Sequence, residues 1–147
     1  DERAVVFAVD VSESVPPQDR RRLLDWTRRA WAARRPGDQA GLVLFGSRAR
    51  VDLPLTESFD PAEPSLEGLP RDRTAIDQAL RTAAGLLRGV EAERQIVLLS
   101  DGNGDATRAS REAMALASTG VQVTTVALEL VPSPREVLVG DVVAPPL

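Results

Sequence analysis

The chain has 147 residues and a formal net charge of −4, with 43% hydrophobic and 27% charged residues. This composition is typical of one folded domain with its own core, and it argues against a disordered chain. The sequence contains no His, Cys or Lys. That excludes a Ser-His-Asp triad, a Cys nucleophile, a Schiff-base lysine and a His/Cys zinc site. The remaining ligands are oxygen atoms, which suit Mg²⁺, Mn²⁺ or Ca²⁺.

The acidic balance and an aromatic content of 3% argue against nucleic-acid binding. No apolar run approaches the roughly 20 residues that a membrane-spanning helix needs. Because the chain begins at Asp1 rather than Met and ends at Leu147, we expect a piece of a longer protein. Any membrane contact would then come only through the missing flanks, and the piece itself is expected to be monomeric.

Two buried strands with a helix between them are predicted for the first third of the chain. Residues 4–9 are a continuous apolar run that ends at Asp10, as in a central strand covered on both faces. Pro16 and Pro17 open a helix that runs to about Arg35. Residues 40–45 form the second buried strand.

This helix is amphipathic, and its apolar half is predicted to pack on a sheet. The apolar half consists of Leu23, Leu24, Trp26, Ala30, Trp31 and Ala33. We expect both tryptophans to be core residues rather than binding anchors. The other half carries arginines, which we expect to be solvated rather than in contact with a membrane or a partner. They are Arg21, Arg22, Arg28, Arg29 and Arg35.

An edge strand and a long loop are predicted next. Residues 51–55 alternate between apolar and polar and contain Pro54, which favours an antiparallel edge strand after a short turn. Residues 56–73 show little periodicity and form a long loop, a feature that is often functional. Its acidic side chains are expected to be solvated; they are Glu57, Asp60, Glu63 and Glu67.

The rest of the chain continues to alternate between helices and strands. A helix begins at about Thr74, residues 94–99 form a third buried strand, and a further helix ends at Gly120 before a strand over 121–128. This order predicts an α/β fold, a doubly wound (Rossmann-like), mostly parallel sheet with one antiparallel edge strand and helices on both faces. Ligands in such folds bind beyond the carboxyl ends of the strands.

Oxygen-bearing side chains gather where that edge is expected. Asp10, Ser12 and Ser14 alternate along one extended segment and therefore point the same way. Asp101 follows the third buried strand and meets Asp10 if the two strands are neighbours, and Thr74 begins a helix on the same edge. Two carboxylates held so close repel each other unless a cation lies between them. Two carboxylates, three hydroxyls and water make an octahedral site for a small divalent cation.

At these residues the chain resembles the von Willebrand factor A domain family. The metal-ion-dependent adhesion site of that family has the pattern Asp-x-Ser-x-Ser, then a Thr, then an Asp after a later strand. Asp10, Ser12 and Ser14 match the first element, Thr74 the second, and Asp101 in Leu-Leu-Ser-Asp-Gly the third. The resemblance implies that Mg²⁺, or Mn²⁺ or Ca²⁺, binds here and grips a Glu or Asp carboxylate of a protein partner, without catalysis.

The resemblance also divides the chain. Residues 1–130 are expected to be the von Willebrand factor A domain, and residues 131–147 a tail that adds one more strand, over 136–143, or links to a missing domain. This tail lacks the helical periodicity of the long C-terminal helix that usually closes the family's fold. It is similar to bacterial membrane-anchored members, in which the domain precedes a β-sandwich.

Two other interpretations of the same residues remain open. Asp10 could be the nucleophile of a Mg²⁺-dependent phosphatase of the haloacid-dehalogenase type, although Ser12 stands where that family has a second acid. Its basic residue would have to be Arg94, which begins a strand and is expected at the wrong end of the sheet. Alternatively, Asp10, Ser12 and Ser14 are only turn residues and the domain is a scaffold with an unused site.

Overall fold

The computed structural model describes residues 2–100 and 106–127 of the protein. In chain order the elements are β1 (Arg3–Asp10), α1 (Pro17–Ala32), β2 (Gln39–Phe45), β3 (Ala49–Thr56), α2 (Ile76–Leu87), β4 (Glu93–Ser100), α3 (Ala106–Ala117) and β5 (Val121–Ala127). Within these residues no helix has the length and apolar character needed to cross a bilayer. The strand expected over 136–143 and the tail boundary at 131 lie outside the described residues.

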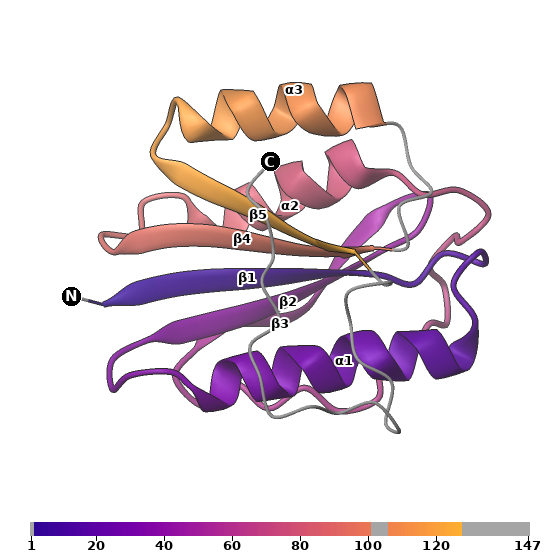
Figure 1. Cartoon of the computed structure of the whole chain (residues 1–147), viewed down its shortest axis with the longest axis horizontal. Coiled ribbons are helices and arrows are strands. Elements are labelled where there is room, and N and C mark those ends of the chain that lie inside the picture. Colours follow the sequence, from indigo (N-terminus) through magenta and orange to yellow (C-terminus); the bar gives the residue numbers. More distant parts are fainter. Residues whose placement is uncertain (1, 101–105, 128–147) are drawn as a thin grey trace.

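The five strands form one sheet in the order β3-β2-β1-β4-β5. β1 is parallel to both β2 and β4, β4 is parallel to β5, and only the edge strand β3 is antiparallel. Helix α1 covers one face of the sheet, and α2 and α3 cover the other (Figure 1). The predicted doubly wound fold with an antiparallel edge strand is therefore confirmed.

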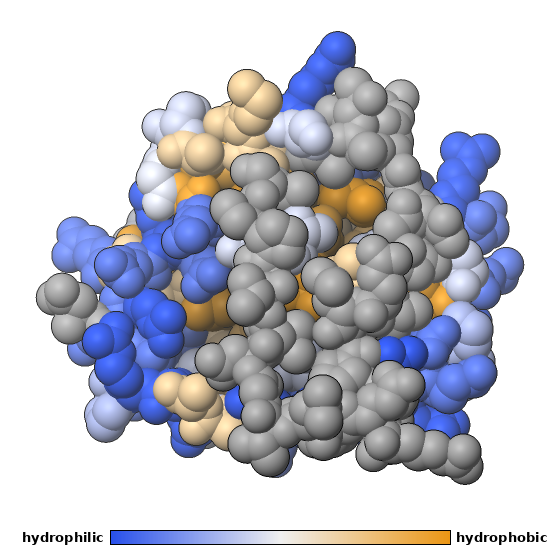
Figure 2. Space-filling model, in the orientation of Figure 1, coloured by the Kyte–Doolittle hydropathy of each residue, from blue (hydrophilic) through white to orange (hydrophobic). Residues whose placement is uncertain are grey.

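Successive residues of β1 face two different cores, which explains why the whole strand is apolar. On one side, Phe7 packs in a cluster with Leu24 and Trp31 of α1. On the other side, Val6 packs in a cluster with Leu80 of α2. In the view of Figure 2, hydrophilic side chains gather at both ends of the sheet, where the strands begin and where they end.

Helix α1 ends at Ala32, three residues before the predicted end, and Ala33 is exposed rather than part of the inner face. Thr27 takes a buried place on that face, where its hydroxyl donates to the Leu23 carbonyl at 3.0 Å. That hydrogen bond lets a polar residue occupy a core position. Trp31 is buried and Trp26 half-buried against the same core, which agrees with the expectation that both are core residues.

The long loop between β3 and α2 packs against the protein more than its acidic composition suggests. Its predicted acidic residues are exposed, but Phe59 and Leu69 are buried. The Phe59 ring stacks on Phe7 with centroids 5.6 Å apart and meets the edge of Trp31 at the same distance. The loop is therefore a packed layer that covers part of the α1 face.

Arginine side chains attach this loop to its surroundings through backbone carbonyls. Arg28 Nε donates to the Pro61 carbonyl at 2.8 Å. Arg50 donates to the carbonyls of Ser65 and Glu67, at 2.5 and 2.8 Å. Arg28 is exposed, in agreement with the expectation that the α1 arginines are solvated, and its hydrogen bond also joins the helix to the loop.

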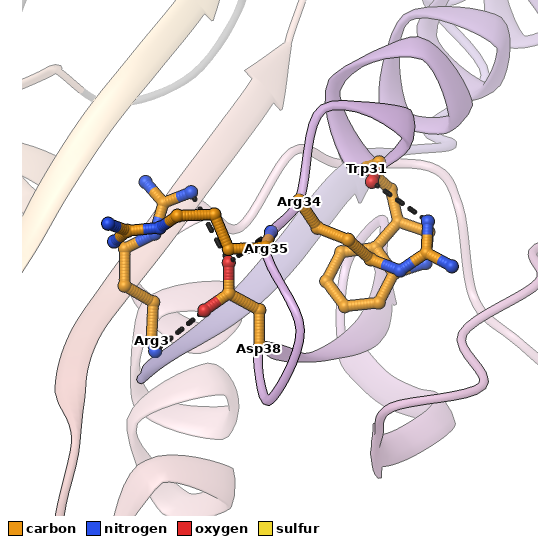
Figure 3. A network of polar contacts seen from close by, with 5 residues as sticks. All are labelled: Arg3, Trp31, Arg34, Arg35 and Asp38. Atoms are coloured by element: carbon orange, nitrogen blue, oxygen red, sulfur yellow. Dashed lines mark hydrogen bonds and ion pairs between the residues drawn. The ribbon is translucent and has the colours of Figure 1, made fainter. Parts of the chain in front are cut away.

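The edge where the strands begin is closed by a buried carboxylate, Asp38, which is 3% exposed. It accepts hydrogen bonds of 3.0 Å from the backbone N–H groups of Arg3 and Arg35, and the Arg3 guanidinium lies 3.5 Å away (Figure 3). The N–H of Arg35, followed by the N–H and the charge of Arg3, holds the pKa of Asp38 below its usual value despite burial. Beside this network, the Arg34 guanidinium lies 4.8 Å from the ring centroid of Trp31.

Candidate metal centre

The opposite edge of the sheet, where the parallel strands end, brings the polar ends of β1 and β4 together. Val9 is registered with Leu99, so the last residues of the two strands, Asp10 and Ser100, are neighbours. The strand adjacency on which the sequence argument depended is therefore present. Asp101 lies outside the described residues.

Asp10 is fully buried, and neutral groups of the described residues donate hydrogen bonds to its carboxylate. Oδ1 accepts hydrogen bonds from the backbone N–H and the hydroxyl of Ser12, at 2.9 and 2.6 Å. Oδ2 accepts from the hydroxyl of Ser100 at 2.9 Å. These bonds fix the orientation of the carboxylate, and none of these donors carries a charge of its own.

Two more hydroxyls complete the group. Ser14 Oγ lies 3.0 Å from Ser12 Oγ, and the Thr74 hydroxyl donates to Ser12 Oγ at 2.9 Å although the two residues are 62 positions apart. The structure thus brings four of the five predicted ligands together. Thr74 precedes α2 by two residues rather than beginning it.

The place of Thr74 depends on contacts between three loops. The N–H of Ala75 donates to the Gly46 carbonyl, that of Ser47 to Pro70, and that of Glu13 to Arg71, at 2.8 to 2.9 Å. A Cβ at Gly46 would lie 2.6 Å from the Pro70 oxygen and 2.8 Å from the Arg71 Cα. Only glycine allows the backbones to approach so closely. The Gly46 loop therefore sets where the Thr74 hydroxyl lies.

Next to these loops, an exposed carboxylate also carries a shifted pKa. The Ser47 hydroxyl donates a hydrogen bond to Asp72, and this bond holds the pKa of that carboxyl below its usual value. The same hydroxyl accepts from the N–H of Arg73 at 3.0 Å. Asp72 thus stays ionised at neutral pH while it ties the turn after β2 to the segment before Thr74.

The donor set of the edge fits a small divalent cation. Its atoms are carboxylate and hydroxyl oxygens, which are the ligands that Mg²⁺, Mn²⁺ and Ca²⁺ prefer. In the part of the chain that the structure describes, no group of three or more Asp, Glu, His or Cys side chains forms a metal site of another kind. Asp10, Ser12, Ser14 and Thr74 are therefore the described residues that could hold such an ion.

Two residues at this edge were not predicted from the sequence. Ser100 donates to Asp10, and it could have been found by registering the third buried strand against the first. Arg71 binds the loop after β1 twice, because its guanidinium donates to the Val11 carbonyl at 3.2 Å while its own carbonyl accepts from Glu13. No sequence pattern identifies Arg71, since the contact depends on the path of the long loop.

The phosphatase interpretation gains no support from the structure. The basic residue that it would need, Arg94, is registered with Ala4 at the beginning of β1. It therefore lies at the opposite edge of the sheet from Asp10. Its guanidinium donates instead to the Thr119 carbonyl at 2.6 Å.

The fold and the site define an open-sheet α/β domain with an oxygen-lined site at the carboxyl ends of its strands. No curated protein matches the chain in sequence. The model of the von Willebrand factor type A domain, however, matches residues 5–103. The chain belongs to this family, whose domains generally mediate metal-dependent protein interactions and are generally not enzymes.

Solved structures of other proteins share the fold at low sequence identity. An aerotolerance-related membrane protein from Bacteroides fragilis is 23% identical with a TM-score of 0.72, over 98% of this chain and 80% of that one. BatB from Bacteroides thetaiotaomicron is 24% identical with a TM-score of 0.67, over 97% and 74%. The proximal thread matrix protein 1 of the mussel byssus, with a zinc-occupied metal-ion-dependent adhesion site, is 19% identical with a TM-score of 0.69, over 86% and 35%.

Proposed function

We propose that this domain binds a protein partner through a divalent cation held by Asp10, Ser12, Ser14, Thr74 and Asp101. Mg²⁺ is the ion we expect, with Mn²⁺ or Ca²⁺ as substitutes. The partner offers a Glu or Asp carboxylate that completes the coordination of the ion. In this proposal residues 1–130 are the binding domain, and residues 131–147 add a strand or link it to a further domain.

One observation carries the proposal. Hydroxyls from two separate loops, of Ser12 and Ser14 on one and of Thr74 on the other, meet beside the buried carboxylate of Asp10. A buried carboxylate is costly unless its charge is compensated. Carboxylate and hydroxyl oxygens are the ligands that small divalent cations prefer, so the arrangement supports a cation site.

The choice of neutral ligands explains why the partner would be acidic. Serine and threonine hydroxyls donate no charge to the ion, so a divalent cation held by two aspartates is at most neutralised by the protein. A carboxylate from outside replaces water on the ion more favourably than a neutral group does. One such contact buries little area, so the loops around the site must add specificity.

Capture of partners from a lysate of the source cell, by the immobilised domain, tests the proposal. Binding should occur in Mg²⁺, disappear with EDTA and return when Mg²⁺ is restored. The variants Ser12→Ala and Thr74→Ala should lose it while keeping the circular dichroism spectrum of the wild type. Ser118→Ala and Thr119→Ala are matched controls, because both hydroxyls are exposed and bond within the end of α3. Capture that is unchanged by EDTA would contradict the proposal.

A further inference from the structure

Two half-buried arginines flank the loop that leaves β1. Arg71 Nη1 donates to the Val11 carbonyl at 3.2 Å, and Arg20 Nη1, from the first turn of α1, donates to the Val15 carbonyl at 3.5 Å. Val11 directly precedes Ser12. The Arg71 guanidinium therefore lies within about 8 Å of the Ser12 hydroxyl, given the dimensions of one residue.

The two guanidinium groups donate to carbonyls four residues apart in this loop, and the positive charge of Arg71 acts on Arg20. The pKa of Arg20 lies below its usual value because the side chain is partly removed from water and because the positive charge of Arg71 disfavours its proton. Arg21 adds to this effect and Glu63 opposes it. A guanidinium is always charged in proteins, so the fold places two like charges on one loop beside the candidate metal site.

Neither guanidinium lies within 4.0 Å of a carboxylate among the described residues. Each has five N–H donors, and the contacts to the Val11 and Val15 carbonyls use one on each. Donors therefore remain on both groups. A planar carboxylate is the anion that guanidinium groups bind best, because its two oxygens accept parallel hydrogen bonds.

We infer that Arg20 and Arg71 form a second carboxylate subsite, so that the partner presents two acidic residues, one to the cation and one to the arginine pair. The inference rests on the proposed function and adds the requirement for a second acidic residue. A carboxylate between the two guanidinium groups relieves their repulsion, which a neutral side chain does not do. The pair thus selects partners with two nearby carboxylates over partners with one.

The test uses capped glycine–serine octapeptides that contain one glutamate, or two glutamates separated by zero to three residues. Their affinities are measured by NMR titration of the Mg²⁺-loaded domain at constant ionic strength. At the best spacing, two glutamates should bind about tenfold more tightly than one, as expected for charge-assisted hydrogen bonds. In Arg20→Gln, this ratio should fall to about two, the number of equivalent carboxylates, with the affinity of the one-glutamate peptide unchanged. In Arg20→Gln/Arg71→Gln the ratio should fall likewise.

The controls separate the subsite from net charge and from folding. Arg29→Gln/Arg88→Gln removes the same charge from exposed positions and should keep the tenfold ratio. Thermal melting and the Mg²⁺ midpoint of each variant check the fold, and Arg20→Gln alone leaves the Arg71 contacts in place. A ratio of two in the wild type, or tenfold in the Arg20 variants, overturns the subsite and leaves the proposed function standing. Absence of Mg²⁺-dependent binding by every peptide overturns both.

Discussion

Two buried aspartates lie at opposite edges of the sheet and are held in different ways. At the edge where the strands begin, Asp38 accepts backbone N–H groups and pairs with the Arg3 guanidinium (Figure 3). At the edge where they end, Asp10 accepts one backbone N–H and the hydroxyls of Ser12 and Ser100. The donors to Asp38 therefore include a charged guanidinium, whereas these donors to Asp10 are uncharged.

This difference separates a structural carboxylate from one suited to binding. A cationic partner within the chain stabilises the folded state but occupies the carboxylate. The hydrogen bonds that Asp10 accepts from Ser12 and Ser100 come from uncharged groups, which is compatible with the proposed cation site. The two edges should therefore respond differently when the carboxylate, the metal or the pH is changed.

The largest expected effect is at Asp38. Asp38→Ala leaves the N–H groups of Arg3 and Arg35 without this acceptor and should lower the free energy of unfolding by about 3 kcal/mol, with or without Mg²⁺. The folded-state pKa of Asp38 lies below its unfolded value, so its contribution is complete above about pH 5. It is lost as the pH falls through the folded pKa. Urea unfolding of the wild type and of Asp38→Ala from pH 7 to 3 measures the difference between their free energies of unfolding, which should shrink as the pH falls. Asp60→Ala, at an exposed position, is the control.

Asp10 should show the opposite dependence. Mg²⁺ at a hundred times its Kd should stabilise the wild type by about 2.7 kcal/mol, roughly 8 °C in melting temperature. Asp10→Asn keeps the size of the side chain and should abolish this shift, whereas Asp38→Asn should be less stable and keep it. Differential scanning calorimetry with and without Mg²⁺ measures both. Equal changes in melting temperature for Asp10→Asn and Asp38→Asn would mean that the two aspartates do not differ in their response to Mg²⁺.

A smaller effect is expected at Gly46, because it changes the metal edge without touching a ligand. Gly46→Ala places a Cβ against the backbone of Pro70 and Arg71 and should cost about 2 kcal/mol. It should also raise the Mg²⁺ concentration needed for half the stabilisation, since it displaces the segment that holds Thr74. Gly85→Ala is the matched control: its Cβ meets nothing within 4 Å and, inside α2, should stabilise slightly.

The smallest effect concerns the arginines of α1, which lie between the two edges. Arg28→Gln loses the bond to the Pro61 carbonyl and should cost about 1 kcal/mol. Arg29→Gln, at an exposed position, should stay within about 0.5 kcal/mol of the wild type. Chemical denaturation of the two variants measures the difference. Equal values would mean that the hydrogen bond between Arg28 and the Pro61 carbonyl adds no stability.

Much of the fold follows from the sequence because its strands are continuous apolar runs. The run over 4–9 requires cover on both faces, and Pro54 requires an edge, so the sheet and its antiparallel strand could be predicted. The end of α1 could not be placed as well, since Ala33 continues the apolar period although the helix stops. Thr27 was missed because its buried hydroxyl is satisfied by its own helix.

The candidate site, too, could be predicted from the sequence only in part. That Asp10 and Ser12 share one edge with Thr74 could be predicted, because all three lie at or near the ends of regular elements. Their role as metal ligands stays a prediction, as does that of Asp101. Ser100 and Arg71 needed the strand register and the path of the long loop, which tertiary contacts determine. Phe59 is the clearest case, since nothing in its acidic neighbourhood indicates that it stacks on Phe7.

The way in which arginines attach the long loop has a consequence for how this domain can diversify. Arg28 and Arg50 bind the loop through the carbonyls of Pro61, Ser65 and Glu67, and every residue type supplies a carbonyl. Replacing an exposed loop residue therefore leaves these attachments intact, provided that Phe59 and Leu69 are kept. Substitutions in the loop can therefore change partner preference without destabilising the fold. This loop is the segment that we would randomise in a library of binding variants.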